Sequence, residues 1–190
     1  SFQPRNVGDG NVTGVEMEAR QSLKPIGRSF ENFSVNVNVT FASSRIRFSE
    51  TEYESRVANA REGQTIGRYR DMAGQAPWLV NAGFSYKANG KEGPLASLEA
   101  GLFYNVQGPT LQYVGMVDRP DIYSVPFHSL NFNANTSIGR NKRVRAGVLI
   151  ENILGDKTEL VYRSFGAEEQ FFTRLNPGRR VQVRLSYRLH

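Results

Sequence analysis

Several residue types and segments are scarce or missing in this chain of 190 residues, and each absence excludes a class of protein. There is no cysteine, which excludes disulfide scaffolds, thiolate zinc sites and cysteine nucleophiles. Only two histidines are present, too few for a histidine metal cluster. No stretch of about 18 apolar residues occurs, so the sequence contains no transmembrane helix. Hydrophobic residues make up 39% of the chain, slightly below the usual share, which indicates a thin core and not disorder.

What the chain does contain is a regular alternation of apolar and polar residues. Phe33–Phe41 alternates over nine residues without an error, and Leu130–Ile138 and Val181–Leu189 follow the same pattern. An α-helix repeats about every 3.6 residues and cannot present this pattern as one apolar face, whereas a strand can. Together with four less strict segments, the alternation predicts seven strands, near residues 12–21, 33–43, 78–87, 95–106, 129–138, 143–153 and 179–189.

The connections between the expected strands alternate between short and long. A short one contains Asn89-Gly90, a strong tight-turn dipeptide. The three long ones span residues 44–77, 107–128 and 154–178. Transmembrane barrels have short turns on the periplasmic side and long loops outside, while a soluble sandwich has no reason to put all its long loops at one end. The pattern therefore favours an all-β fold, an antiparallel transmembrane β-barrel with extracellular loops at these three ranges.

The side chains of the expected strands divide into an uncharged face and a charged face. A Lys or Arg that faces lipid near the midplane costs about 2–4 kcal/mol, which is sufficient reason for one face to lack charge. Aromatic residues such as Phe33, Phe41, Trp78 and Tyr86 lie near the strand ends, where interfacial girdles are found. The charged residues of the opposite face are expected to line the lumen or contact a plug: Glu16, Glu18, Arg20, Glu99, Arg143, Arg145, Arg180, Arg184 and Arg188.

Seven antiparallel strands do not close a barrel, because the first and the last run in the same direction. Bacterial single-chain barrels have even numbers of strands, and lipid does not tolerate open strand edges. We therefore expect residues 1–190 to be the C-terminal part of a longer chain, with the remaining strands and a plug before Ser1. One wall of an assembly is the alternative. If the short turns are periplasmic, the C-terminus is periplasmic too.

Six segments, in this order, carry a resemblance to a known family. They are Gly14–Arg20, Glu31–Val35, Gly74–Tyr86, Pro120–Tyr123, Glu151–Leu154 and Asn176–Arg179, followed by a final alternating strand. The chain thereby resembles, over nearly its whole length, the C-terminal end of a TonB-dependent outer-membrane receptor, the Bacteroidetes type in particular. In that family a barrel of about 22 strands encloses an N-terminal plug, so these strands would be the last seven.

The resemblance implies energy-coupled uptake of a large, scarce solute across the outer membrane of a Gram-negative bacterium. The solute classes are siderophore, glycan, peptide or cofactor. The implied partners are outer-membrane lipid, the missing barrel and plug, a TonB energy complex that acts through a segment outside this sequence, and a surface lipoprotein lid. The sequence contains no catalytic constellation, so we expect no enzymatic activity, and we expect neither a cofactor nor a metal.

Ligand-contacting residues are expected in the long connections, because binding residues concentrate in loops. The candidates are Arg68, Tyr69, Arg70, Tyr113, Arg119, Asp121 and Tyr123. For each of them, packing over the barrel mouth is the alternative. We interpret Glu50, Glu52 and Glu54 as a solvated acidic loop, with an external divalent cation as the alternative.

The net charge of +6 raises the question of nucleic acid as a partner. The arginines of the last two strands all lie on the charged face, which favours one lumen wall that pairs with acidic plug residues or attracts an anionic solute. We therefore expect no nucleic acid. Two rival interpretations remain: a non-transporting barrel component of an outer-membrane complex, and a soluble basic β-domain that binds nucleic acid or carbohydrate.

Overall fold

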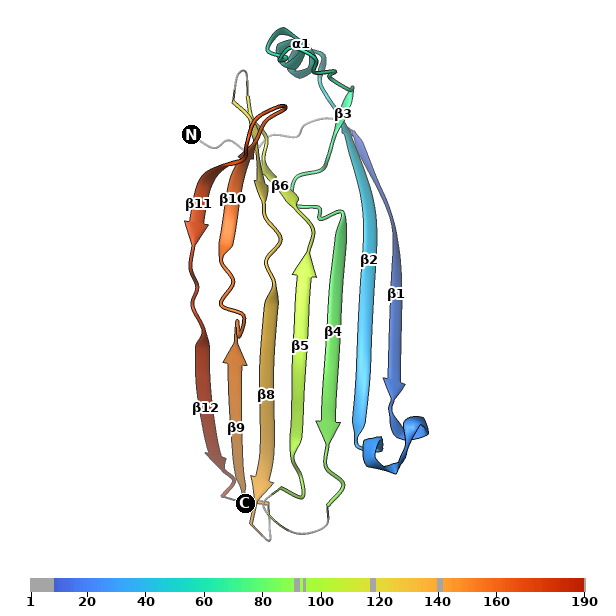
Figure 1. Cartoon of the computed structure of the whole chain (residues 1–190), viewed down its shortest axis with the longest axis vertical. Coiled ribbons are helices and arrows are strands. Elements are labelled where there is room, and N and C mark those ends of the chain that lie inside the picture. Colours follow the sequence, from blue (N-terminus) through green and yellow to red (C-terminus); the bar gives the residue numbers. More distant parts are fainter. Residues whose placement is uncertain (1–8, 91–92, 94, 117–118, 140–141, 190) are drawn as a thin grey trace.

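The chain is built almost entirely of antiparallel β-structure (Figure 1). The structure is a computed structural model that describes residues 9–90, 93, 95–116, 119–139 and 142–189. It contains a large sheet, a smaller sheet, one α-helix (α1, Glu50–Ala58) and two 3₁₀ turns (η1, Lys24–Ile26, and η2, Arg28–Phe30). Within the described ranges, none of these helical segments is long and apolar enough to cross a membrane.

The seven segments that alternate in the sequence all form strands of the large sheet, in the order β1-β2-β4-β5-β8-β9-β12. Their bounds are Gly10–Ser22 (β1), Phe33–Arg47 (β2), Trp78–Lys87 (β4), Glu99–Gln107 (β5), Ser129–Ile138 (β8), Val144–Glu151 (β9) and Arg180–Tyr187 (β12). A two-residue strand, β3 (Tyr69–Arg70), pairs with the end of β2. The main differences from the expected ranges are at β2, which continues to Arg47, and β5, which begins at Glu99.

The strand register brings the apolar positions together on one face. Val37 lies opposite Ala19 on one side and Ala82 on the other. Leu102 lies in the same way between two aromatic residues of β4 and β8. The described residues do not cover this face: Val183 is 82% exposed and Leu185 is 75% exposed. We call it the apolar face.

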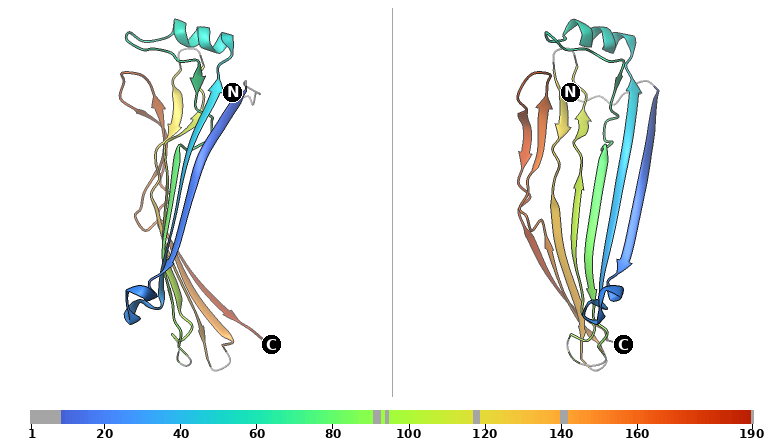
Figure 2. Two further views of the ribbon diagram at one scale, coloured as in Figure 1. Left: turned by 90° about the vertical axis from the view of Figure 1, so that its right-hand side faces the viewer. Right: turned by 45° about the vertical axis from the view of Figure 1, so that its right-hand side comes forward.

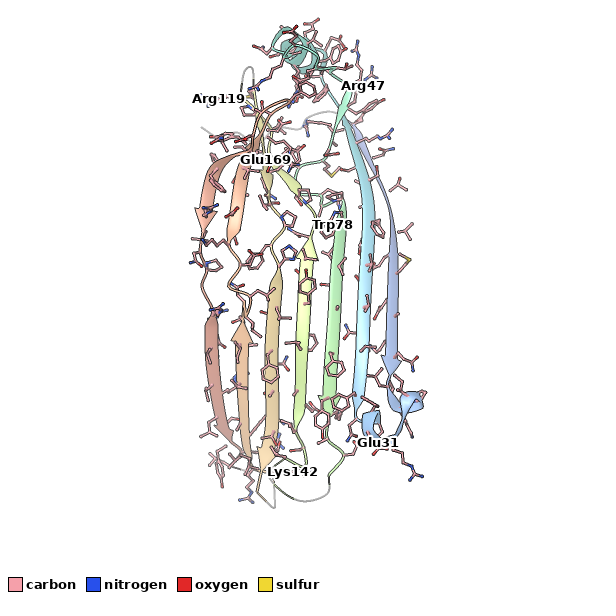
Figure 3. The ribbon with its side chains drawn as sticks, in the orientation of Figure 1. Glu31, Arg47, Trp78, Arg119, Lys142 and Glu169 are labelled. Atoms are coloured by element: carbon pink, nitrogen blue, oxygen red, sulfur yellow. The ribbon has the colours of Figure 1, made fainter. Side chains whose placement is uncertain are left out.

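The apolar face has a defined upper limit, near α1. On β2 its last apolar residue is Phe41, which is paired with Trp78; the next residues on the same face are Ser43, Arg45 and Arg47. Figure 3 shows Trp78 and Arg47 toward the α1 end and Glu31 and Lys142 at the opposite end. From Phe33 to Phe41 the band extends about 26 Å along the strand, at about 3.3 Å per residue.

The smaller sheet continues four strands of the large one. It has the order β11-β10-β7-β6, with β6 at Thr110–Tyr113, β7 at Asp121–Ser124, β10 at Thr158–Arg163 and β11 at Gln170–Leu175. Each of its strands is an extension of one strand of the large sheet, which we call the parent strand. β6 follows its parent β5, β7 precedes β8, β10 follows β9 and β11 precedes β12. The four extensions therefore lie in the same order as their parent strands. Figures 1 and 2 show the smaller sheet beyond the end of the large sheet, not stacked on its face.

Proline and left-handed residues explain why the sheet is interrupted. Pro109, Pro126 and Pro177 lie between parent strand and extension, and proline has no N–H to donate to a strand ladder. After β9 the chain turns at Asn152, which has a positive φ of 52°, and before β12 it turns at Gly178, with φ 68°. The strands therefore stop at similar heights and resume after the interruption.

The expectation that residues 44–77, 107–128 and 154–178 are loops was wrong in part. These ranges hold α1, β3 and the four strands of the smaller sheet. The segments form strands because each pairs with a neighbouring extension, which satisfies the backbone: β7 pairs with both β6 and β10. Glu50, Glu52 and Glu54 do not form a loop but lie in α1, where the Ser49 hydroxyl caps the helix by accepting a hydrogen bond from the Glu52 N–H at 3.2 Å.

The buried core lies at the α1 end, where the smaller sheet meets the end of β2. Its most buried apolar side chains are Leu111, at 1% exposure, and Val161, at 3%. Ile122, Ile46 and Phe48 are also buried. The segment between α1 and β4 is attached by hydrogen bonds from Met72 N–H to Ser44 Oγ (3.0 Å) and from Gly74 N–H to the Leu111 carbonyl (2.8 Å).

Both edges of the large sheet are unpaired among the described residues. β1 pairs only with β2, and β12 pairs only with β9. The arrowheads of β1 and β12 in Figure 1 both point away from α1, so the two edge strands run in the same direction.

Candidate ligand-binding groove and charged strand face

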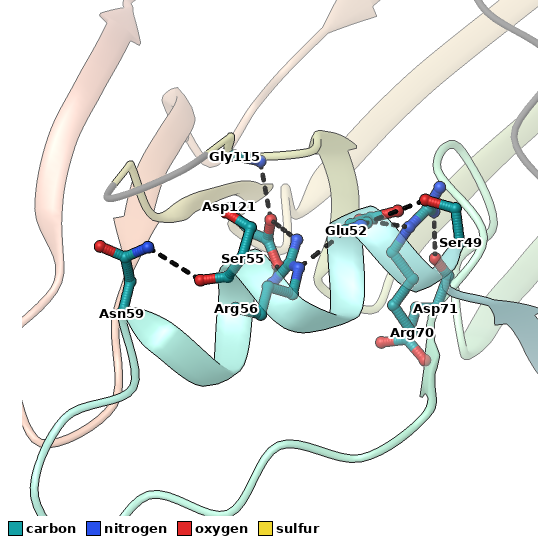
Figure 4. Close-up of polar contacts among 9 residues, drawn as sticks. All are labelled: Ser49, Glu52, Ser55, Arg56, Asn59, Arg70, Asp71, Gly115 and Asp121. Carbon is teal, nitrogen blue, oxygen red and sulfur yellow. Dashed lines mark hydrogen bonds and ion pairs between the residues drawn. The ribbon is translucent and has the colours of Figure 1, made fainter.

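An ion pair between Arg56 of α1 and Asp121 of β7 forms the centre of the candidate site (Figure 4). Arg56 Nη2 donates to Asp121 Oδ1 at 2.8 Å, and Nη1 donates to Oδ2 at 3.2 Å. The Gly115 N–H donates to Asp121 Oδ1 at 2.8 Å. Burial lowers the pKa of Arg56, but the hydrogen bonds and charge of Asp121, together with Glu52, outweigh it and raise that pKa. This two-pronged contact therefore attaches α1 to the smaller sheet in the charged state.

Glu52 extends this network to β3. Its Oε1 lies 3.5 Å from Arg56 Nε and 3.5 Å from Arg70 Nε. These three atoms are buried and make no hydrogen bond within the described part of the chain. The side chains are only 19%, 22% and 10% exposed, respectively. The charges are therefore compensated, while hydrogen-bonding capacity remains unused.

Arg68 helps to position α1. It donates to Glu50 at 2.9 Å, and its guanidinium lies 4.0 Å from the centre of the Tyr53 ring. Because both partners belong to α1, Arg68 fixes the helix against the chain that leads to β3.

Two clefts flank the Arg56–Asp121 pair. One has a volume of about 510 Å³ and is lined by β2, β3 and β7 residues, including Ser43, Tyr69 and Tyr123. The other, of about 610 Å³, lies toward the β10–β11 hairpin and includes Arg119 and Phe165. Arg56, Ile66 and Asp121 line both clefts. We call the two together the groove.

The structure brings five of the seven expected ligand residues to the groove. Tyr69, Arg70, Asp121 and Tyr123 line the first cleft, and Arg119 and Asp121 line the second. Arg68 and Tyr113 line neither: Arg68 is paired with Glu50, and the Tyr113 ring meets Phe172 edge-on at 6.0 Å.

Four arginines that were not among the expected residues also line the groove: Arg45, Arg56, Arg61 and Arg163. The spacing of Glu52 and Arg56, typical of one helical face, was the only available signal.

Tyr123 lies between the charges of this region. The Arg163 guanidinium covers its ring at 4.5 Å. Burial raises the pKa of the Tyr123 hydroxyl, and the carboxylates of Asp121 and Asp71 raise it further, against the opposing effects of Arg163 and Arg56. The hydroxyl is therefore a neutral hydrogen-bonding group well into the alkaline range.

Within the strands, the residues expected to line the lumen all lie on the charged side of the sheet, opposite the apolar face. On β1 they are Glu16, Glu18 and Arg20, and Arg20 lies 3.8 Å from Glu18. On β5, Glu99 pairs with Lys87 at 2.7 Å.

The arginines of the last two strands are unevenly paired. Arg180 donates to Glu151 at 2.6 Å. The side chains of Arg143, Arg145, Arg184 and Arg188 make no hydrogen bond or ion pair with any described residue; the Arg188 N–H donates to the Arg143 carbonyl at 2.9 Å. Among the described residues, this leaves a cationic area without acidic partners at the end of the sheet away from α1.

No metal site is evident in the described ranges, where no three His, Cys, Asp or Glu side chains gather. Glu50 and Glu52 are instead paired with arginines.

Comparison with known proteins gives no relative for this chain. No protein-family profile, no curated protein and no solved structure matches it.

Proposed function

We propose that this chain is part of the wall of a closed transmembrane β-barrel in the outer membrane of a Gram-negative bacterium, in a receptor of the TonB-dependent type that takes up a large solute. The observation that carries the proposal is the apolar face. It is continuous over the seven strands, contains no charge between its limits, and is left uncovered by the described residues. Lipid is the surrounding that such a face fits best.

The dimensions of the face support this proposal. A tilted strand crosses a bilayer in about 9–11 residues, and the alternating stretch of β2 has that length. Aromatic side chains mark both limits. At the end away from α1, the Phe33 ring lies 5.3 Å from Phe84 and 4.9 Å from Tyr86. At the α1 end, Phe41 pairs with Trp78. Rings at these heights match the interfacial girdles of membrane barrels.

The unpaired edges support closure by further strands. Backbone groups at an open edge cannot remain unpaired in lipid. Because β1 and β12 run in the same direction, antiparallel closure requires an odd number of additional strands between them. In the proposed protein these strands come from the rest of the polypeptide; strands from another chain would meet the same geometric condition.

The two ends of the sheet suggest its orientation. α1 and the smaller sheet lie at one end, which we assign to the cell exterior, and the short turns lie at the other, which we assign to the periplasm (Figure 1). The charged face then lines the lumen, where the unpaired arginines of β9 and β12 meet acidic residues of a plug. A TonB energy complex acts on that plug, and a surface lipoprotein is the partner that would cover the α1 end. In this assignment the chain supplies wall and loops, without enzymatic activity.

Membrane fractionation followed by gel mobility tests the proposal. The protein that contains these residues should sediment with outer membranes, require detergent for extraction, and migrate faster in SDS gels before heating than after. Loss of an energized solute-uptake activity on deletion of its gene should follow. Membrane integration without uptake would instead indicate a non-transporting barrel component. Extraction in salt without detergent would indicate a soluble β-domain and reject the proposal.

A further inference from the structure

The groove beside Arg56 consists of two neighbouring clefts. They have volumes of about 510 Å³ and 610 Å³ and share Arg56, Ile66 and Asp121, so one lies on each side of the ion pair. One arm extends toward the exposed Tyr69 ring and the other toward the exposed Phe165 ring. A compact solute would fill one cleft only. A chain-like ligand can occupy both and pass the Arg56–Asp121 pair.

The lining of the groove is rich in guanidinium groups. Six arginines contribute to it against three carboxylates: Arg45, Arg56, Arg61, Arg70, Arg119 and Arg163, with Asp71, Asp121 and Glu168. The Arg119 side chain is exposed and makes no ion pair or hydrogen bond with any described residue. Within the described residues, the only side-chain hydrogen bond of Arg61 goes to the Phe165 carbonyl, at 3.2 Å. Guanidinium groups with unused N–H donors are well suited to carboxylates.

The remaining lining fits hydroxyl groups and ring faces. Asp71 and Glu168 make no hydrogen bond or ion pair through their carboxylates with the described residues, so both are free to accept hydrogen bonds from ligand hydroxyls. Thr65 and Gln170 add groups that both donate and accept. The Tyr69 side chain is 56% exposed and Phe165 is 50% exposed, which leaves their rings open to apolar ring faces of a ligand.

We propose that the groove binds an acidic oligosaccharide, with sugar carboxylates on Arg119 and Arg61 and sugar hydroxyls on Asp71, Glu168 and the neighbouring amides. That this ligand is the transported solute rests on the proposed transport function. That the groove binds it rests on the groove alone. An acidic peptide would also satisfy the arginines and can donate backbone N–H groups to Asp71 and Glu168, so an acidic peptide is the competing ligand in the test below. A neutral oligosaccharide would supply no counter-charge to Arg119, which has none among the described residues.

Calorimetric titration of the purified protein tests the site. The probes are trigalacturonate, the neutral galactotriose and triglutamate, at equal ionic strength. Trigalacturonate should bind most tightly, and Arg119→Gln and Arg61→Gln should each weaken it about tenfold, the effect of losing one charge-assisted hydrogen bond. Arg28→Gln is the charge-matched control, because Arg28 lies in η2 at the far end of the sheet and makes no side-chain hydrogen bond with any described residue. This variant should bind as the parent does.

Three results with the parent protein overturn the site: no binding of trigalacturonate, equal binding of galactotriose, or tighter binding of triglutamate. An equal loss in all three arginine variants also overturns it, because only general electrostatic attraction would then remain. Unchanged Trp78 fluorescence in each variant verifies that the fold is retained. The titration does not depend on transport. Binding of trigalacturonate without uptake in cells rejects the transport function and keeps the site. Energized uptake of another solute without trigalacturonate binding rejects the site and keeps the transport function.

Discussion

Asn152 donates a hydrogen bond from its side-chain Nδ2 to the carbonyl oxygen of Gly178 at 2.8 Å. The residue that follows β9 thereby holds the turn that precedes β12, although 26 positions separate the two. The same Nδ2 donates to the Asp156 carbonyl at 3.0 Å, and Asn152 Oδ1 accepts from the Asp156 N–H at 3.1 Å. One buried amide thus fixes both ends of the third long connection at the point where the large sheet is interrupted.

Replacing Asn152 with Ala should destabilise the protein by about 2–3 kcal/mol. The change leaves the Gly178 and Asp156 carbonyls without their donor in a region where Asn152 is only 6% exposed, and an unsatisfied buried group costs about 1–3 kcal/mol. Asn152 has a φ of 52°, so Asn152→Gly is the control that relieves the backbone and still lacks the amide. Urea unfolding in detergent micelles, followed by Trp78 fluorescence, gives the difference. An unfolding midpoint equal to that of the parent protein in both variants would show that the amide contributes nothing.

The seven long strands of the large sheet could be predicted because each alternates over enough residues to distinguish a period of two from the helical period. The smaller sheet could not. β6 and β7 have four residues each, too few for alternation to stand out, and they are strands because neighbouring extensions pair with them. The same limit applies to the site. Asp121 was a reasonable ligand candidate as a polar loop residue, but its partner Arg56 is 65 positions away, and only the fold brings the two together.

Trp78 should report contact with the lipid interface. It is the only tryptophan, it lies at the upper limit of the apolar face, and a Cβ added to Gly108 would come within 2.7 Å of its indole nitrogen. In reconstituted protein, bromines placed near the lipid headgroup should quench its fluorescence more strongly than bromines near the chain ends. Gly108→Val should displace the ring and change this ratio. Equal, weak quenching by both lipids in the parent protein would place Trp78 away from the bilayer.

The attachment of α1 should depend on the Arg56–Asp121 ion pair. Both side chains are less than a quarter exposed, at 22% and 15%, so Asp121→Asn should lower the free energy of local opening of α1 by about 1–3 kcal/mol. Amide hydrogen exchange at the Tyr53 N–H, which donates to the Ser49 carbonyl at 2.9 Å, measures this opening. In a double-mutant cycle with Arg56→Gln, the two effects should be less than additive. Full additivity would mean that the pair is not coupled.

Stability in alkaline solution should depend on Tyr123. Burial and the nearby carboxylates raise its folded pKa above the ordinary value of 10.0, so the neutral hydroxyl contributes stability that is fully present below that value and is lost as the pH rises through the folded pKa. Relative to Tyr123→Phe, the parent protein should therefore lose unfolding free energy as the pH rises above the ordinary tyrosine pKa of 10.0. Urea unfolding of both proteins across this range measures the difference. A constant difference would show that the hydroxyl is no harder to ionise than in the unfolded chain.

The two faces of β12 should respond oppositely to an added charge. Val183 lies on the apolar face and is 82% exposed, while its neighbour Gln182 points to the charged face. If lipid covers the apolar face, Val183→Arg should cost about 2–4 kcal/mol and reduce the amount of heat-modifiable protein in outer membranes. Gln182→Arg adds the same side chain one residue away, on the wet face, and should assemble at the parent level. Equal assembly of both variants would mean that water covers the apolar face, whereas equal loss would point to a general intolerance of β12 to arginine.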